Sequence, residues 1–443
     1  MDNVPKQHIF KRPSDPAGAA AAFEGDLFDR AAMAERLTGY LSRLPDGAVI
    51  AIDAPWGEGK TWFGRHWRAS LQACGYRTAY IDCFQRDHID DPFLMIAAEL
   101  LALAKASHSS RGAELLDASK RIGAKLLPAA AKLAAGAAGH WISGNAELGE
   151  DIAKAIGRAG DAASDSIEKM VAKRLEDYES DKRSVDGFKK TLTELAAERD
   201  TPVVIFVDEL DRCRPDFAVR TIERAKHFFE APGVVFVLLL NRSQLAAAVE
   251  GLYGPRIDSY AYLGKFIQLS LGLPKRLSAG PHGLDDNRTY CAKSLELHGF
   301  AATHGAKQFA EAMGVLATIF GLSLRDIEQA VALYSLAQPI DFSSAYIAWP
   351  IALKLARPDL FRRVLGNEMA AHAEARQELA RAKDRAGGED WALDPFEDLH
   401  ACAEGGFKKE PETGPAENLL RRMNLRPRDL LRMLFGRIDL AVD

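Results

Sequence analysis

APWGEGKTW, residues 54–62, follows an apolar run and places two glycines, a lysine and a threonine in one short turn. This spacing fits the phosphate-loop pattern Gly/Ala-x4-Gly-Lys-Ser/Thr, in which main-chain N–H groups surround the phosphates of a nucleotide. Gly57 and Gly59 let the backbone turn around an anion, Lys60 reaches the terminal phosphates, and Thr61 is a ligand for Mg²⁺. Ala54 stands where the pattern often has its first glycine, and alanine is acceptable there if its φ is negative.

The residues predicted to bind the nucleotide form one run along this loop. A helix is expected to follow to about Cys74, and its positive N-terminal end favours an anion in the loop. The two tryptophans are expected to pack beside the loop in preference to stacking on a base. The predicted set is Pro55, Trp56, Gly57, Glu58, Gly59, Lys60, Thr61 and Trp62.

Four apolar runs alternate with segments of helical character, which predicts an α/β fold. Continuous apolar strands are typical of a sheet buried on both faces, so we expect a P-loop NTPase parallel sheet sandwiched by helices. The strands are predicted within residues 48–54, 77–84, 201–215 and 233–245.

Changes in composition divide the chain into a core with an insertion and two helical parts. Residues 106–185 are rich in alanine and charge and have no strand pattern, which predicts a helical insertion. The other predicted parts are an N-terminal segment 1–45, the P-loop core 46–275, a helical lid 286–370 and a C-terminal helical tail 371–443.

An acidic motif, IFVDELD at residues 205–211, ends the third predicted strand. Asp208 stands at the carboxyl end of this buried strand, where Mg²⁺ is expected at the edge of the sheet. Glu209 is placed to orient or deprotonate an attacking water, because phosphoryl transfer needs an in-line nucleophile. The alternative is that these carboxylates cap the next helix or form surface ion pairs.

Composition indicates an ordinary globular protein. The 443 residues are 47% hydrophobic and 27% charged, and the net charge of −5 gives no overall basic character for nucleic acid. The five cysteines form no CxxC pair, which indicates a reducing compartment, and the first residues lack an apolar signal core, so we expect a cytoplasmic location. The longest uncharged stretch within residues 126–146 is too short to span a membrane, so integral membrane association is not expected.

Six motifs, taken in their order along the chain, resemble those of the KAP family of P-loop NTPases. The resemblance covers about residues 20–335 and includes the long insertion between the two nucleotide motifs. The resemblance implies ATP and Mg²⁺ as cofactors. The chain departs from the family pattern at three positions: the family would favour glycine at Ala54, aspartate at Glu209 and an acidic residue at Asn241. The motifs are DLFDRAAMAERL (26–37), IDAPWGEGKT (52–61), YIDCF (80–84), VVIFVDELDRCRP (203–215), VVFVLLLNRSQL (234–245) and YLGKFIQLSLGLP (262–274).

Three further polar residues are candidates for the reaction. Asn241 ends the fourth predicted strand, where its amide could bind the attacking water or the γ-phosphate, and a turn-forming role is the alternative. Arg325 in GLSLRDIEQA resembles the arginine that a helical lid brings to the nucleotide, and a solvated helix charge is the alternative. Lys265 could reach the phosphates of a neighbouring subunit, although a surface lysine is favoured.

The C-terminal segment 418–440 is the basic part of the chain. Its arginines alternate with leucines at roughly helical spacing, and a helix pair that closes the lid is favoured over a surface for a partner, a membrane or nucleic acid. The arginines are Arg421, Arg422, Arg426, Arg428, Arg432 and Arg437.

Together these features predict a Mg²⁺-dependent NTPase, with ATP favoured, that acts as a conformational switch. The family resemblance implies a role in bacterial defence against phage or plasmids, with a homo-oligomer or a separate partner protein. Two alternatives stay open: a nucleotide-binding scaffold that does not hydrolyse, and a P-loop small-molecule kinase.

Overall fold

The computed structural model divides the chain into two compact units. The sheet unit is Glu35–Asp53 and Trp67–Leu271, and the helical unit is Met1–Ala34, Ala54–His66 and Gly272–Asp443. The predicted insertion at 106–185 and the segment 126–146 lie outside the residues that the structure describes. The described residues are 15–16, 21–87, 96, 99, 103, 189–190, 192–229, 231–275, 284–300, 303–337, 344–385, 393–407, 411 and 414–439.

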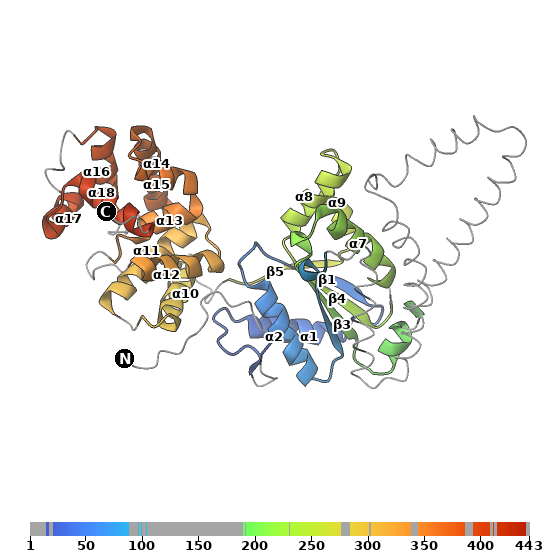
Figure 1. The fold of residues 1–443 in the computed structure, drawn as a ribbon. Coiled ribbons are helices and arrows are strands. Elements are labelled where there is room, and N and C mark those ends of the chain that lie inside the picture. The colour runs from blue at the N-terminus through green and yellow to red at the C-terminus, as the bar shows by residue number, and fades with distance from the viewer. Residues whose placement is uncertain are drawn as a thin grey trace, which may run out of the picture. The chain divides into compact units, whose positions relative to one another are not determined.

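A five-stranded sheet with the strand order β2-β3-β4-β1-β5 forms the sheet unit (Figure 1). The pairs β2·β3, β3·β4 and β1·β4 are parallel, as the alternation of strands and helices predicts. The strands are β1 (Ala48–Asp53), β2 (Thr78–Asp82), β3 (Val203–Asp208), β4 (Val234–Leu240) and β5 (Leu269–Gly272). The first four correspond to the four predicted strands, whereas β5 has no counterpart among them.

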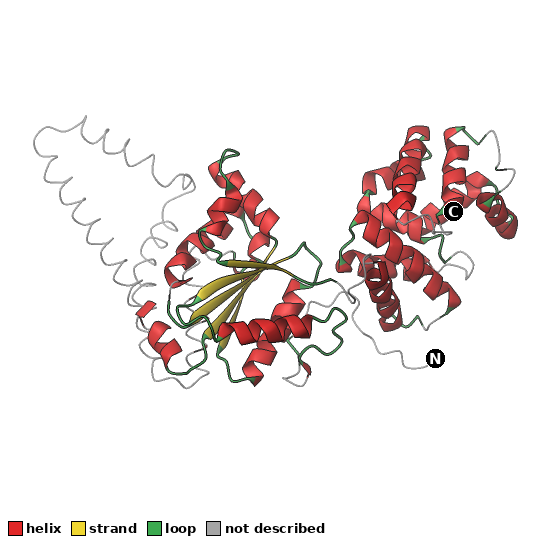
Figure 2. Cartoon of the chain, turned by 180° about the vertical axis from the view of Figure 1, so that it is seen from behind, coloured by secondary structure: helices red, strands yellow, loops and turns green. Residues whose placement is uncertain are grey.

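Both faces of the sheet are buried because alternate apolar side chains point to opposite sides of each strand. On one face, Ile205 and Phe236 belong to a core that includes Phe217 and Leu245 from the helices above them. On the other face, the Phe206 ring meets the Trp67 ring edge-on, with centroids 5.4 Å apart. Figure 2 shows helices on both sides of the strands. The predicted fold class, a parallel sheet sandwiched by helices with further helices at the C-terminal end, is therefore confirmed.

Helices connect the strands at positions that local sequence signals explain. Strand β4 ends at Leu240, within the predicted range 233–245, because the Asn241 side chain caps the next helix by accepting from the Gln244 N–H. The helices are α1 (Arg30–Leu41), α2 (Lys60–Ala73), α7 (Pro215–Phe229), α8 (Arg242–Tyr253) and α9 (Ser259–Gly264), with short 3₁₀ turns η2 (Phe84–Arg86) and η3 (Leu210–Arg212).

The C-terminal helices of the helical unit enclose a separate apolar core, which includes Trp349, Phe361 and Phe435. A proline in the first turn starts four of these helices, since its missing N–H has no partner there in any case. They are α10 (Leu284–Leu297), α11 (His304–Phe320), α12 (Leu324–Ala337), α13 (Ala348–Ala356), α14 (Pro358–Leu365), α15 (Met369–Arg385), α16 (Asp394–Glu404), α17 (Pro415–Met423) and α18 (Pro427–Ile438).

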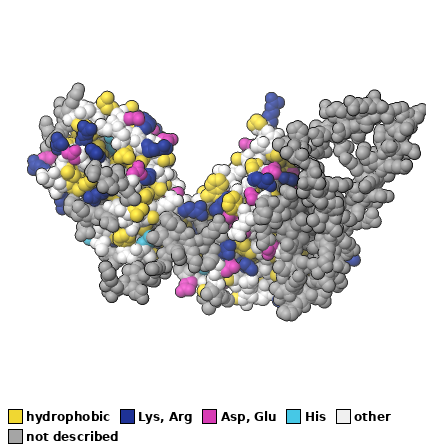
Figure 3. Space-filling view, viewed as in Figure 1, with side chains coloured by type: hydrophobic (Ala, Val, Ile, Leu, Met, Phe, Trp, Pro, Cys, Tyr) yellow, Lys and Arg dark blue, Asp and Glu magenta, His cyan; other side chains and the backbone are white. Residues whose placement is uncertain are grey.

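The basic C-terminal segment forms α17 and α18, whose leucines join this core. Two arginines of this segment lie on the surface instead, where Arg421 pairs with Glu417 and Arg426 pairs with Asp429. On the face seen in Figure 3, basic and acidic side chains are interspersed over the helical unit. Within the described residues, no helix combines the length and apolar character needed to cross a membrane.

Candidate functional site

The phosphate loop, residues 54–61, connects the end of β1 to the start of α2. Gly57 has φ 87° and Gly59 has φ 80°, both in the left-handed region that glycine adopts at low cost. Ala54 is not among the residues with positive φ, and an alanine is acceptable at this position under that condition. The loop therefore has the two left-handed turns that wrap a backbone around an anion.

Lys60 is the first residue of α2, and its side chain is buried within the loop. Its Nζ atom donates hydrogen bonds to the carbonyl oxygens of Ala54 (2.7 Å) and Pro55 (3.1 Å), and the residue is 7% exposed. The N-terminus of α2 adds its partial positive charge at the same place. Thr61 follows in the first turn of the helix and is half-buried.

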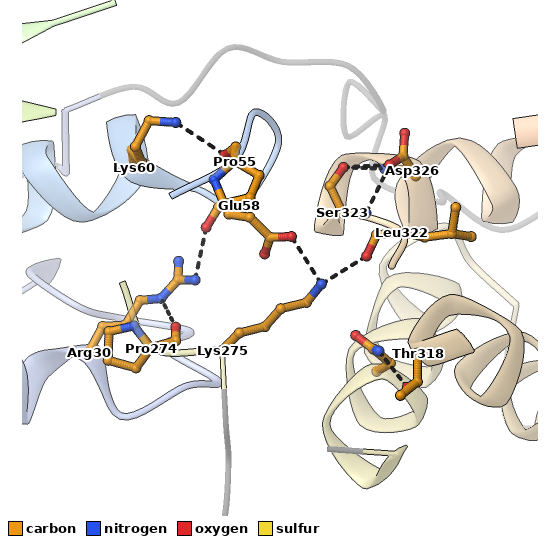
Figure 4. A network of polar contacts seen from close by, with 11 residues as sticks. Arg30, Pro55, Glu58, Lys60, Pro274, Lys275, Thr318, Leu322, Ser323 and Asp326 are labelled. Carbon is orange, nitrogen blue, oxygen red and sulfur yellow. Dashed lines mark hydrogen bonds and ion pairs between the residues drawn. The ribbon is translucent and has the colours of Figure 1, made fainter. Parts of the chain in front are cut away.

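Two cations outside the loop bind Glu58 (Figure 4). Arg30 donates from Nη2 to the Glu58 carbonyl oxygen (2.9 Å) and from Nε to the Pro274 carbonyl oxygen (3.1 Å). Lys275 Nζ lies 3.0 Å from Glu58 Oε1 and donates to the Leu322 carbonyl oxygen at 2.8 Å. Burial lowers the pKa of Arg30 to about 10, against the opposing effect of the nearby carboxylates, so the guanidinium stays charged at neutral pH.

The turn between α11 and α12 also contacts the loop. A Cβ atom on Gly57 would lie 2.4 Å from Ser323 Oγ, and the Arg325 N–H donates to the Gly57 carbonyl oxygen at 3.3 Å. Ser323 and Asp326 form a reciprocal capping box at the start of α12, with contacts of 2.8 and 3.2 Å between side chain and backbone N–H. The Arg325 side chain itself is exposed.

The two tryptophans flank the loop in different environments. Trp62 stacks on His66 with ring centroids 4.0 Å apart and meets Phe23 edge-on, so it packs within the helical unit. Burial lowers the pKa of His66, whose Nδ1 accepts the Phe23 N–H. Trp56 is 43% exposed.

Asp208 ends β3 in the sheet unit and is 2% exposed. The Tyr80 hydroxyl donates to Asp208 Oδ2 at 2.6 Å, and the Glu209 N–H donates to Oδ1 at 2.8 Å. In the register of the sheet, Asp208 pairs with Leu239 and Asp53, at the end of β1, pairs with Leu240. The strand that leads into the phosphate loop therefore ends at the same edge of the sheet as Asp208.

Glu209 adopts a left-handed conformation, with φ 59° and ψ 24°, which is uncommon for a residue with a side chain. Its carboxylate lies 2.7 Å from Arg212 Nη1, within η3. A strained backbone conformation persists only where the surrounding structure holds it in place. Such conformations are found most often at functional sites.

The remaining predicted residues lie at other points of the molecule. Asn241 is the N-cap of α8, and the Arg242 N–H beside it donates to Asp53 Oδ1 at 2.9 Å. Lys265 is exposed at the end of α9, and its Nζ lies 5.5 Å from the centre of the Tyr262 ring. Lys265 and Tyr262 line an open groove of about 590 Å³ together with Glu223, Lys226 and Phe266.

The two predicted Mg²⁺ ligands carry oxygen groups, which are the groups that Mg²⁺ prefers. Within the part of the chain that the structure describes, no group of three His, Cys, Asp or Glu side chains could hold a metal by itself. Mg²⁺ in such sites needs only one or two protein oxygens, since phosphates and waters supply the rest. The Thr61 hydroxyl in the helical unit and the Asp208 carboxylate in the sheet unit are each an oxygen ligand of this kind.

Sequence reasoning missed three residues that contact predicted site residues: Tyr80 beside Asp208 in the sheet unit, and Arg30 and Lys275 beside the loop in the helical unit. Tyr80 is held by β2, next to β3, whereas Arg30 and Lys275 reach the loop from distant positions in the chain. A sequence signal exists only for the α11–α12 turn, where Ser323 and Asp326 have the spacing of a capping box.

Comparison with known proteins identifies a family. The model of the KAP family P-loop domain matches residues 30–284. The chain resembles in part the ORC2 protein of Aeropyrum pernix, solved in ADPNP–ADP complexes, with 10% identity, 98% of each chain covered and a TM-score of 0.38. It also resembles a DNA replication initiation factor, with 11% identity, 98% of this chain and 100% of that chain covered, and a TM-score of 0.36. No curated protein matches.

Proposed function

Because the chain belongs to the KAP family of P-loop proteins, we propose that it binds ATP with Mg²⁺ at the phosphate loop and hydrolyses it as a conformational switch. One observation carries this proposal. The phosphate loop combines two left-handed glycines with a buried lysine at the start of a helix, and β1, the strand before it, ends at the same edge of the sheet as β3 with its buried Asp208. Main-chain N–H groups, an ammonium and a carboxylate are thereby available for a nucleotide triphosphate and its metal.

Each group has a defined task in this proposal. Lys60 binds the terminal phosphates, in exchange for its present contacts with the Ala54 and Pro55 carbonyl oxygens. Thr61 and Asp208 would hold Mg²⁺, which when bound supplies charge neutralisation on the phosphates. Tyr80 fixes the Asp208 carboxylate through its hydrogen bond to Oδ2.

Glu209 is the proposed base for the attacking water. Its carboxylate is held by Arg212, so a change of partner from Arg212 to water would prepare it for proton transfer. The same ion pair favours a second candidate function, a nucleotide-binding scaffold in which Glu209 never leaves Arg212. The role in defence against phage or plasmids stays a prediction of the family resemblance.

The test is ATP binding by the Lys60→Ala variant, measured by calorimetry with Mg²⁺. A charge-assisted contact is worth about 1.5–3 kcal/mol, so the affinity should fall about tenfold or more. Lys293→Ala is the matched control, because Lys293 forms an exposed ion pair with Glu296 on α10 and its loss should leave binding unchanged. Equal affinity of Lys60→Ala and the wild type would refute the assignment of the site.

A further inference from the structure

Two peptide groups of the phosphate loop are held from outside by their carbonyl oxygens. The Gly57 carbonyl accepts from the Arg325 N–H, and the Glu58 carbonyl accepts from Arg30 Nη2. A trans peptide is planar, so its N–H points away from its C=O. Each of the N–H groups of Glu58 and Gly59, which share these two peptide planes, therefore points away from the group that holds its carbonyl oxygen.

These two N–H groups are suited to bind an anion. Within the described residues, neither donates a hydrogen bond to another group. Successive main-chain N–H groups that point to one side form the concave anion sites of phosphate loops. Arg30 and the turn that contains Arg325 thus fix the directions of the Gly59 and Glu58 N–H groups. The side chain of Lys60 donates instead to the carbonyl oxygens of Ala54 and Pro55.

Glu58 introduces a negative charge into a loop that must accept phosphates. The side chain is buried, with Oε1 paired to Lys275 and no partner for Oε2 among the described residues. An unpaired carboxylate here would repel an anion, and Lys275 together with Arg30 leaves this group of three charges with a net positive charge. Lys275 also donates to the Leu322 carbonyl oxygen, so the same ammonium joins the loop to the α11–α12 turn.

We infer that Lys275 and Arg30 are positioning residues for nucleotide phosphates, and that they couple occupancy of the phosphate loop to the α11–α12 turn. All of these contacts lie within the helical unit. The inference rests on the proposed nucleotide binding at the loop. Because coupling is reciprocal, nucleotide should hold the turn against the loop as strongly as the turn favours nucleotide.

The first experiment measures the affinity for ATP and Mg²⁺ of three variants. Lys275→Met should bind at least about fivefold more weakly, the lower end of typical coupling effects, whereas Lys275→Arg should stay within about twofold of the wild type because it can keep the ion pair. Lys307→Met is the matched control, since Lys307 is exposed on α11. If the methionine variant does not fold, Lys275→Gln, which keeps a donor for Leu322, should show the same weakening.

A double-mutant cycle and hydrogen exchange separate positioning from a merely structural role. In a Glu58→Gln background, Lys275→Met should weaken binding less, because there is no carboxylate to compensate. ATP should slow exchange of the Arg325 amide in the wild type and not in Lys275→Met. Wild-type affinity of Lys275→Met, or ATP-independent exchange at Arg325, would overturn the inference. If Lys60→Ala still weakens binding in the same assay, the proposed function survives that failure, whereas unchanged binding by Lys60→Ala refutes the function itself.

Discussion

The imidazoles of His372 and His400 face each other in the core of the helical unit, with their Nδ1 atoms 2.8 Å apart. Trp349 Nε1, which can only donate, lies 3.2 Å from His400 Nε2, so that nitrogen carries no proton. His400 therefore carries its proton on Nδ1 and donates it to His372 Nδ1. The arrangement requires both imidazoles to be neutral.

This pair predicts loss of stability in mild acid. Burial lowers the pKa of His400 to about 3, with smaller contributions from His372 and Arg376, and burial lowers the pKa of His372 against the effect of Glu404. Below the ordinary histidine pKa of about 6.5, the unfolded chain therefore binds protons that the folded chain excludes. Stability is present above that pH and falls as the pH is lowered toward 3. His400 alone should cost about 2 kcal/mol between pH 7 and pH 5, at 1.36 kcal/mol per pKa unit.

Denaturant unfolding at pH 7 and pH 5 measures this loss. His304→Ala is the control, because His304 is exposed at the start of α11 and the variant should keep the full pH dependence. His400→Phe should reduce the pH dependence of the unfolding free energy, whatever the absolute stability of that variant. A wild-type protein with the same unfolding free energy at both values would contradict the neutral pair.

Gly57→Ala should weaken ATP binding and destabilise the helical unit. An alanine there meets two penalties, a left-handed φ and a Cβ atom 2.4 Å from Ser323 Oγ. Gly75→Ala separates them, since Gly75 has φ 82° but open space around its Cβ position, and it should cost only about 1–2 kcal/mol. Calorimetry for ATP and thermal unfolding are the measurements. Equal costs at both positions would show that the contact with Ser323 is unimportant.

Much of the fold could be predicted because its signals are local in the chain. β3 and β4 are continuous apolar runs, since both faces of each strand are buried, and such runs are visible without knowledge of their neighbours. The phosphate loop is equally local, because its glycines and Lys60 act within one turn. The strand β4 ends at Leu240, directly before Asn241, because the side-chain oxygen of Asn241 caps the helix that follows.

The support of the loop could not be predicted because it depends on contacts between distant segments. Lys275 and Glu58 are 217 positions apart, and Arg30 and Glu58 are 28 positions apart, with no shared periodicity. The same holds for Tyr80 and Asp208, which meet only because β2 pairs with β3. Local patterns identify groups that carry chemistry, but the residues that orient them depend on tertiary packing.

Glu209→Gln should retain ATP binding and lose most of its hydrolysis. The amide cannot accept a proton from water, and general base catalysis contributes about 10²–10⁴-fold to such rates. Phosphate release at saturating ATP is the measurement, with Glu417→Gln, which alters an ion pair on the surface of α17, as the control. If the wild type itself releases no phosphate at any protein concentration, the scaffold function would replace hydrolysis.

Either Lys265 or Arg325 is predicted to supply a positive charge for hydrolysis, and Lys265, which is exposed at the end of α9, would do so on the nucleotide of a neighbouring subunit. A basic residue supplied from another molecule is worth about 10³–10⁵ in the rate of phosphoryl transfer. Specific ATPase activity should therefore be low in dilute protein and rise with protein concentration. Arg325 is the competing source of charge, and it would act within its own chain because its main chain contacts Gly57 in the same loop.

Mixing two inactive variants distinguishes these sources. A Lys265→Ala subunit keeps an intact phosphate loop, and a Lys60→Ala subunit keeps an intact Lys265, so a mixed assembly should recover part of the activity that neither variant has alone. Arg325→Ala mixed with Lys60→Ala should recover none, because the arginine and the loop that it serves belong to one chain. Activity that does not change between nanomolar and tens of micromolar protein, together with a monomer by light scattering in ATP, would exclude self-assembly. Activation would then have to come from a different protein, and the exposed arginines of α17 and α18 would be the first surface to test for its binding.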